Sequence, residues 1–394
     1  MHSLTCRGFT AGGVAAGIKK DGHLDLGLLV SDRPARVAAV FTNNRVQAAP
    51  VLLDRMRVKS GTARAVIVNA GNANCANGEE GMAAARAMTA AAARAVGVPD
   101  EQVLAASTGV IGAPLPLEKV LAALPALAGR LDENGVPDLA RAMMTTDTRP
   151  KAGVREGTVD GVSYRIVGVA KGAGMIRPDM ATMLCFIWTD ADVAVGVLQT
   201  ALRHAVDGSF NRMTIDGDTS TNDTVILMAN GATGARIETD PDKADFRQLL
   251  EDLCRDLARQ MVKDGEGVTK VVELRVRGAR SDDDARAIAD TIAHSPLVKT
   301  AFFGEDANWG RIIAAAGRAG VFLEPARLDL YFDDVQMVKD GVGCGVDAEA
   351  KATAVLKQAE FTVILDLNQG SGSAVMLTCD FSLDYVKINA DYRS

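Results

Sequence analysis

The sequence predicts a protein of the α/β class, and three observations support that prediction. Short runs rich in Val and Ile alternate along the chain with longer runs that carry apolar residues at helical spacing. The composition is typical of a globular protein, with 48% hydrophobic and 24% charged residues. The length of 394 residues is enough for two domains or one large one. Alternation of strands and helices indicates a layered α/β or α+β fold.

The predicted strands are short, rich in Val and Ile, and bounded by Gly, Asn or Asp, which favour turns. In chain order they are residues 35–42, 64–69, 102–106, 163–170, 183–189, 224–230, 270–276, 327–332 and 361–367.

The predicted helices lie between many of these strands. The first of them is rich in Ala, with Met and Val at helical spacing. In chain order the helices are residues 80–96, 115–127, 195–206, 245–262, 282–293 and 348–359. No low-complexity linker or internal repeat separates them, so the composition marks no domain boundary.

Charge and composition exclude several classes of protein. Lys and Arg number 43 against 50 Asp and Glu, a net charge of −7, and aromatic residues make up 4%. A nucleic-acid partner is therefore not expected. No apolar run approaches the roughly 18–20 residues of a membrane helix, and the start lacks the apolar core of a signal peptide. We expect a soluble cytoplasmic protein whose six cysteines are reduced and mostly buried.

Common catalytic motifs are absent from the sequence. The four histidines lie far apart without an HExxH pair, and GxSxG, GxxxxGK[ST] and GxGxxG do not occur. The loop from Asp216 begins like a calcium loop, but Ser220 and Thr221 replace a ligand and the required Gly. We therefore expect no metal site, and a polar turn at this loop. A catalytic base, if there is one, must come from elsewhere.

One segment, residues 167–190, carries a signal for catalysis. A strand leads to Lys171, two glycines and Pro178 follow, and Ala181-Thr182 precedes another strand. If the backbone breaks before Thr182, that residue gains an α-amine with a reference pKa of about 7.7–8, which can serve as the base for its own hydroxyl. The alternative from this segment alone is a Gly-Pro turn into a core strand.

The same segment, Lys-Gly-x-Gly-Met-Ile-x-Pro-x-Met-Ala-Thr-Met-Leu, strongly resembles the ornithine acetyltransferase family (bifunctional glutamate N-acetyltransferase/ornithine acetyltransferase). Ala307 and Asp179 depart from the family pattern, which often has Pro and Asn there, and neither has an assigned chemical role. Further matching segments are residues 8–19, the Asn-rich loop from Asn69, 106–112, 144–148, 218–224, 264–267, 304–311 and 389–394.

The resemblance implies helices layered on packed mixed sheets, an N-terminal-nucleophile type of enzyme, and a smaller C-terminal α/β lobe. It implies self-cleavage between Ala181 and Thr182, which gives a light (α) chain of residues 1–181 and a heavy (β) chain of residues 182–394. Acetyl would then move from N2-acetylornithine to Thr182, and from Thr182 to the amine of L-glutamate. This is a step of cyclic arginine biosynthesis.

The resemblance also assigns site residues. Thr108, through its hydroxyl, and Gly109, through its backbone N–H, would form the oxyanion hole. Lys171 would pair with a substrate carboxylate and lower the pKa of the new amine. Glu266 would either hold an ammonium or assist proton transfer. The remaining positions that match substrate-binding residues are Thr145 (with Thr146 as the alternative), Thr182, Asn389 and Ser394.

Two other functions compete with the acetyltransferase. One is a hydrolase, an amidase or aminopeptidase, that uses the same Thr182 and passes the acyl group to water. The other is an uncleaved binding protein without catalysis. The resemblance implies an assembly of two α and two β chains and no cofactor. Members of the family can also acetylate glutamate from acetyl-CoA, and no nucleotide motif here decides whether this chain does.

Overall fold

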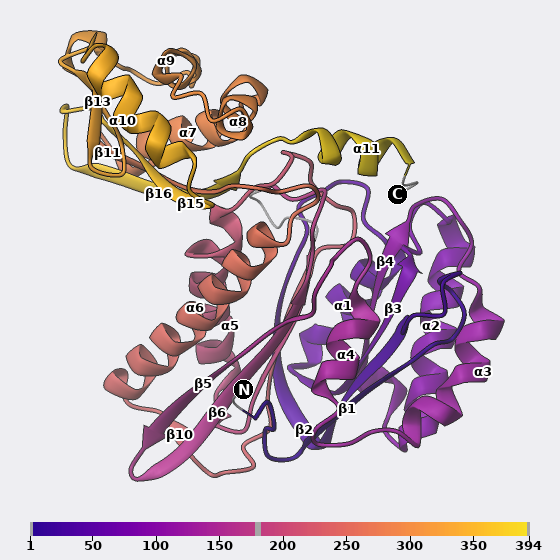
Figure 1. Ribbon diagram of the computed structural model, residues 1–394. Helices are drawn as coiled ribbons and strands as arrows, with labels where there is room; N and C mark the ends of the chain where they lie inside the picture. The colour runs from indigo at the N-terminus through magenta and orange to yellow at the C-terminus, as the bar shows by residue number, and fades with distance from the viewer. Residues whose placement is uncertain (1–2, 178–182, 392–394) are drawn as a thin grey trace. The chain divides into compact units, whose positions relative to one another are not determined.

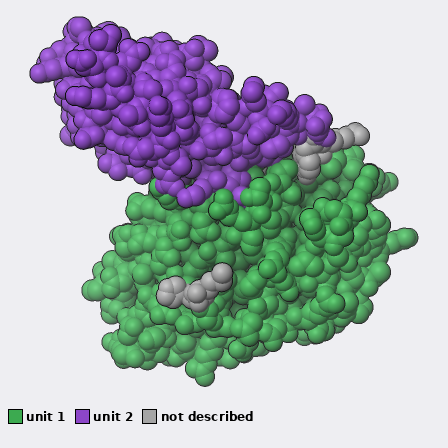
Figure 2. Space-filling view, viewed as in Figure 1, with its two compact units in different colours: residues 1–211, 218–261, 394 green, residues 212–217, 262–393 purple. Residues whose placement is uncertain are grey.

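The computed structural model describes residues 3–177 and 183–391. The chain forms two compact units, which Figure 2 colours separately. The first unit holds residues 1–211, 218–261 and 394, and the second holds residues 212–217 and 262–393. The predicted division between residues 181 and 182 concerns a backbone cut, not folding, and it falls within the sequence of the first unit. It stays a prediction.

One mixed eight-stranded sheet forms the centre of the first unit. Its strands follow in the order β4-β3-β2-β9-β7-β6-β5, and β1 pairs with β2. The β3–β4 and β7–β9 pairs are parallel, and the other pairs are antiparallel. The strands are β1 (Phe9–Val14), β2 (Leu26–Phe41), β3 (Thr62–Asn72), β4 (Val103–Val110), β5 (Lys151–Val159), β6 (Val162–Lys171), β7 (Leu184–Thr189) and β9 (Thr224–Ala229).

This sheet folds back on itself within β2. The pairing of β2 with β3 changes register between Val30 and Ala35, which marks a bulge where the strand can bend. β1 pairs only with the part of β2 before the bulge, and β9 only with the part after it. The two halves share one apolar core, in which the rings of Phe9 in β1 and Trp188 in β7 lie 6.3 Å apart. The packed sheets expected from the sequence are present.

Helices cover the outer faces of the folded sheet (Figure 1). α2 (Gly78–Val96) and α3 (Leu117–Ala128) pack on the half that contains β3 and β4. On the other half, α5 (Val195–Asp207) packs on β2 and β9, and α6 (Asp240–Lys263) packs on β5 and β6. There, Leu257 of α6 lies over Gly168 of β6, where a Cβ would stand 3.1 Å from the leucine side chain. The unit therefore has helix, sheet, sheet and helix layers.

Two more helices border the sheet halves. α4 (Val136–Met143) buries Leu139 and Met143 in the core that the halves share. α1 (Ala49–Arg57) lies against β4 and α2. A short two-stranded pair, β8 (Asp192–Val193) with β10 (Arg236–Ile237), stands apart from the large sheet.

The second unit is a smaller α/β lobe, as the resemblance implies. Its six-stranded sheet has the order β14-β13-β12-β15-β11-β16, and α7 packs on β11 and β16. The strands are β11 (Val271–Ala279), β12 (Asp329–Phe332), β13 (Val335–Lys339), β14 (Val342–Gly343), β15 (Glu360–Asp366) and β16 (Gly372–Cys379). The helices are α7 (Asp282–Ala293), α8 (Pro296–Phe303), α9 (Trp309–Gly317), α10 (Val346–Leu356) and α11 (Leu383–Asp391).

The predicted strands and helices are all present, so the α/β class is confirmed. Their ends shift by at most five residues, except that β2 starts at Leu26, nine residues before the predicted strand 35–42. Five of the cysteines are buried and Cys344 is exposed, also as predicted. Among the described residues, no helix is both long and apolar enough to cross a bilayer. The elements that the sequence did not predict are β1, β5, β8, β10, β13, β14, β16, α1, α4, α8, α9 and α11.

Candidate active site

Three of the predicted site residues meet around the ammonium group of Lys171, the last residue of β6. Its Nζ donates hydrogen bonds to Thr145 Oγ1 at 2.8 Å and to Thr108 Oγ1 at 3.2 Å. Thr108 lies on β4, and Thr145 follows α4. Lys171 is 3% exposed, so its charge is held inside the protein. The fold thus places a cation and two hydroxyls, from three distant parts of the chain, within hydrogen-bond distance.

A buried carboxylate, Asp147, supports this cluster, and the sequence analysis did not single it out. Asp147 Oδ1 lies 2.6 Å from Lys151 Nζ and accepts from the Gly172 N–H at 2.8 Å. Oδ2 accepts from the Thr145 N–H at 3.0 Å and lies 3.9 Å from Lys171 Nζ. Burial would raise the pKa of this carboxyl, but the two ammonium groups and the N–H donors outweigh burial and hold its pKa well below its usual range. The sequence feature that pointed to Asp147 was its place in residues 144–148, a segment that matches the ornithine acetyltransferase family.

Gly109, next to Thr108, occupies a position where a side chain would clash with the neighbouring strand. Its φ is +128°, and a Cβ there would stand 2.4 Å from the carbonyl carbon of Gly71. The end of β4 therefore closely approaches the end of β3. Ser107 Oγ and Asn69 Oδ1, 2.6 Å apart, join the two strands just before this point. The Asn-rich loop noted in the sequence thus borders the predicted oxyanion hole.

The loop before β9 joins two parts of the site, although the sequence analysis predicted only a polar turn there. Asn222 Nδ2 donates to the carbonyls of Ala73 at 2.7 Å and Ser107 at 2.8 Å. Asp223 Oδ1 accepts from the Met183 N–H at 2.9 Å. Asp223 is fully buried, and burial raises the pKa of its carboxyl well above the usual range, although the Met183 N–H and the charge of Lys171 oppose the shift.

Two predicted residues lie together in the second unit. Asn389 on α11 donates from Nδ2 to Glu266 Oε2 at 2.8 Å, and Glu266 is 8% exposed. The next residue, Gly267, has φ +68°, and a Cβ there would stand 2.4 Å from the Tyr385 nitrogen. This close approach lets the Glu266 loop meet the start of α11. The arrangement presents one carboxylate, held by an amide.

The remaining predicted residues, Ala181, Thr182 and Ser394, lie outside the described residues. The cleavage site, the nucleophile and the terminal ligand therefore stay predictions. The described residues contain no group of three or more His, Cys, Asp or Glu side chains that could hold a metal ion.

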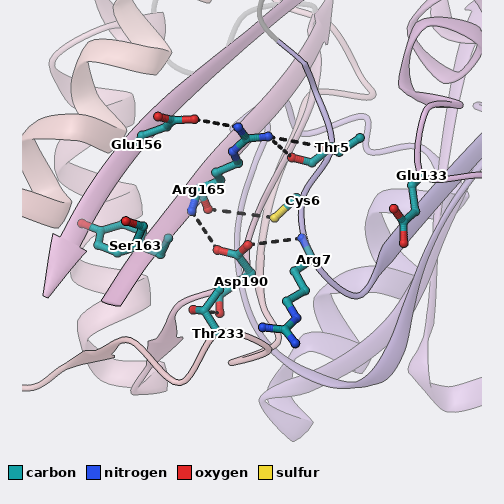
Figure 3. Close-up of a pocket in the computed structure, with 10 residues that line it drawn as sticks. Thr5, Cys6, Arg7, Glu133, Glu156, Ser163, Arg165, Asp190 and Thr233 are labelled. Atoms are coloured by element: carbon teal, nitrogen blue, oxygen red, sulfur yellow. Dashed lines mark hydrogen bonds and ion pairs between the residues drawn. The ribbon is translucent and has the colours of Figure 1, made fainter. Parts of the chain in front are cut away.

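A cavity of about 500 Å³ elsewhere in the first unit is lined by none of the predicted site residues (Figure 3). Asp190 at its centre accepts from the Arg7 N–H at 3.2 Å and from the Arg165 N–H at 2.7 Å. Burial and the Asp190 charge raise the pKa of Cys6 beside it. These contacts fasten the N-terminal segment to β6. The lining residues are Thr5, Cys6, Arg7, Glu133, Glu156, Ser163, Tyr164, Arg165, Asp190 and Thr233.

Comparisons with known proteins agree with one another. The ArgJ family model matches residues 10–394. The arginine biosynthesis bifunctional protein ArgJ of Geobacter sulfurreducens is 54% identical over 99% of this chain and 100% of that protein. The protein of the same name from Syntrophotalea carbinolica is 50% identical over 98% of this chain and 99% of its own. The crystal structure of the Bacillus halodurans ArgJ protein matches with a TM-score of 0.50 and 42% identity, and it covers 52% of this chain and 98% of that chain.

Proposed function

This chain belongs to the ArgJ family, and from that premise we propose that it transfers acetyl from N2-acetylornithine to L-glutamate through an acetylated Thr182. The products are ornithine and N-acetylglutamate. Family membership makes the chain an acyltransferase of arginine biosynthesis. The proposal adds the covalent intermediate and the self-cleavage that prepares it.

Self-cleavage between Ala181 and Thr182 is the first step of the proposal. It frees the α-amine that serves as base for the Thr182 hydroxyl, so no histidine is needed. The crystallised Bacillus halodurans chain supports a cut near the middle, because 98% of that chain accounts for only 52% of this one. The cut gives chains of residues 1–181 and 182–394.

In the second step the Thr182 hydroxyl attacks the acetyl carbonyl of N2-acetylornithine, and ornithine leaves with the proton that the amine took up. The amine of glutamate then attacks the acetyl-threonine ester, which restores the hydroxyl. Each attack places negative charge on the acetyl oxygen. Thr108 and Gly109 would donate hydrogen bonds to that oxygen.

The hydrogen bond from Lys171 to Thr108 is the observation that carries the proposal. Because Thr108 Oγ1 accepts from the Lys171 ammonium at 3.2 Å, its own hydroxyl proton is available to another acceptor. The buried ammonium also adds positive charge where an oxyanion would form. The Thr108 hydroxyl held in this way and the neighbouring Gly109 N–H would together form the pair of donors that acyl transfer requires.

Substrate recognition completes the proposal. Lys171 and Thr145 would bind the substrate carboxylate. Glu266 would hold the side-chain ammonium or move a proton, and Asn389 and Ser394 would add polar contacts. These roles of Glu266 separate kinetically. Glu266→Gln raises KM with kcat nearly unchanged if the carboxylate only binds, and lowers kcat if it moves a proton.

A single assay tests the proposed function. Purified protein is incubated with N2-acetylornithine and glutamate, and the expected products are ornithine and N-acetylglutamate, with two bands on a denaturing gel. Mass spectrometry of the quenched reaction should find the acetyl group on the peptide that begins at Thr182. Thr182→Ala should give one full-length band and no exchange. A cleaved protein that releases acetate equally with and without glutamate is a hydrolase and contradicts the proposal.

The name shared by the relatives, bifunctional protein ArgJ, supports a second activity, the acetylation of glutamate from acetyl-CoA. The same assay with acetyl-CoA as the donor tests it. We also propose that the protein works in the cytoplasm as an assembly of two α and two β chains. Sedimentation measures the mass of that assembly directly.

A further inference from the structure

Lys19 lies in the loop between β1 and β2, beside the strand ends that border the predicted oxyanion hole. A Cβ placed on Gly71 would stand 3.3 Å from Lys19 Cγ, and one placed on Gly109 would stand 2.4 Å from the carbonyl carbon of Gly71. Gly71 and Gly109 are partners in the pairing of β3 with β4. The side chain of Lys19 therefore starts next to the residue that Gly109 approaches, and the mechanism above gives Lys19 no role.

A buried carboxylate, Asp25, fixes the backbone of this loop. It accepts hydrogen bonds from the N–H groups of Ala16 at 2.6 Å, Ile18 at 2.6 Å and Lys19 at 2.9 Å. Its side chain is enclosed, with Asp25 0% exposed, and its carbonyl accepts from the Ala70 N–H at 2.9 Å. One residue thus ties the loop to β3, so the backbone of Lys19 is positioned beside the site before a substrate binds.

The Lys19 ammonium can take a further ligand. Among the described residues its one hydrogen-bond acceptor is the Leu24 carbonyl at 2.8 Å, and it forms no ion pair with a carboxylate. An ammonium carries three donors, so two are left for another group. Lys19 is also only partly buried, which leaves a ligand room to approach.

Lys171 differs from Lys19 in both respects. It is 3% exposed, and its ammonium faces two protein hydroxyls and the Asp147 carboxylate. The charges of Lys171 and Asp147 both act on Lys19, so the three groups share one electrostatic environment. Burial lowers the pKa of Lys19, and the charge of Asp25 opposes that shift. Of the two cations, Lys19 is thus the one whose donors are open to a ligand.

The proposed substrates carry a matching anion at the required place. In both N2-acetylornithine and glutamate, the nitrogen that gives or accepts the acetyl group is bonded to the carbon that bears the α-carboxylate. When the acetyl oxygen lies in the oxyanion hole, the α-carboxylate must therefore lie within a few bond lengths of Thr108 and Gly109. An ammonium beside Gly71 is near enough to meet it.

We propose that Lys19 holds the α-carboxylate that N2-acetylornithine and glutamate have in common, and so selects α-amino acids over amines that lack this group. This role rests on the function proposed above. Lys19 shares the carboxylate with Lys171 and Thr145, and it contributes the donors that the protein itself leaves unused.

Analogues without the α-carboxylate separate recognition by Lys19 from support of the fold. N-acetylputrescine is N2-acetylornithine without this group, and γ-aminobutyrate is glutamate without it. Lys19→Met should lower kcat/KM for both natural substrates by about 10- to 100-fold, mainly through KM, which is the loss expected for one hydrogen bond between charged groups. The same variant should use the two analogues at the wild-type rate, because they have no α-carboxylate to lose contact with.

The neighbouring residue provides a matched control. Lys20 is exposed, so Lys20→Met should behave as wild type with every substrate. Lys19→Arg keeps the positive charge and should recover part of the loss. If Lys19→Met lowers kcat/KM equally for the natural substrates and for the analogues, Lys19 only supports the loop and the proposal is wrong. It is also wrong if Lys19→Met changes neither.

A binding measurement separates this proposal from the proposed function. Calorimetry gives the Kd of ornithine, and of putrescine as the probe without a carboxylate, without any acetyl transfer. Lys19→Met should raise the Kd of ornithine by about 10-fold or more and leave that of putrescine unchanged. This result supports Lys19 even if the wild-type protein exchanges no acetyl, which would end the proposed function alone. An unchanged Kd of ornithine in an active enzyme overturns the role of Lys19 and leaves the proposed function standing.

Discussion

At the scale of single residues, the site depends on charges that the protein buries in pairs. Lys171 and Lys151 both face Asp147, and the Lys151–Asp147 pair is completely enclosed, with both side chains 0% exposed. Such a group was hard to find in the sequence, because Lys and Asp are ordinarily solvated and nothing in their spacing indicates burial. Only the matching segment around Thr145 pointed there.

Removing one partner of this enclosed pair should be costly. Lys151→Met leaves the Asp147 carboxylate without its nearest cation, and we expect a loss of about 3–5 kcal/mol in the free energy of unfolding. Urea unfolding at pH 7 measures it. Arg141→Met serves as control, because the Arg141–Asp138 pair is exposed and should be worth less than about 1 kcal/mol. Equal losses for the two variants would contradict the burial argument.

The low pKa of Asp147 also predicts a pH dependence. The pKa of an unfolded Asp is about 3.9, and the pKa of the folded Asp147 carboxyl lies well below that, so the unfolded state binds more protons as the pH falls. The stability that Asp147 adds is complete above about pH 5 and is lost as the pH falls through the folded pKa. The difference in unfolding free energy between wild type and Asp147→Asn should therefore be constant at neutral pH and shrink below about pH 4. A difference that grows on acidification would refute this.

At the scale of the element, one substitution that adds a single methyl group can test the close approach of the ends of β3 and β4. Gly109→Ala would place a Cβ against Gly71 at a positive φ, so the strand ends must separate. We expect transfer to fall by about 100-fold or more, because one oxyanion donor moves. The exchange assay measures this fall.

Gly97, at the end of α2, provides the comparison for this test. It also has a positive φ, +68°, but no atom lies within 4 Å of its Cβ position. Gly97→Ala should cost only about 1–2 kcal/mol of stability and leave transfer unchanged. Normal transfer in Gly109→Ala would mean that the close approach has no role in the reaction.

The elements that the sequence predicted differ physically from those it did not. Strands such as β7 and β9 are buried on both faces, so they appear as continuous apolar runs. β5 interrupts its apolar residues with glycine, Arg and Glu, and β16 begins with Gly and Ser, so its apolar run is only four residues long. Short helices such as α4 and α8 span only about two turns. The site was predicted by resemblance for Lys171, Thr108 and Thr145. Asp147 and Asp223 were missed because their importance comes from contacts across the fold.

At the scale of the whole molecule, the position of the proposed cut predicts that its products stay together. β7, from the second product, pairs with β6 of the first along residues 166–171 and 184–189, and β9 pairs with β2. These strands lie in the middle of one sheet and share one core. The two chains should therefore coelute on gel filtration at neutral pH and separate only in denaturant. Separation of the fragments in native buffer would contradict this.

Because the proposed cut falls between two central strands, the protein could be assembled from residues 1–181 and 182–394 expressed from two separate genes. Each half synthesised alone would expose a long row of unpaired backbone groups at β6 or β7, the kind of edge at which chains aggregate. Two halves expressed together could instead associate by pairing β6 with β7, as the two fragments of a split reporter protein associate. A library that varies only one half could thus be screened by complementation against a fixed partner.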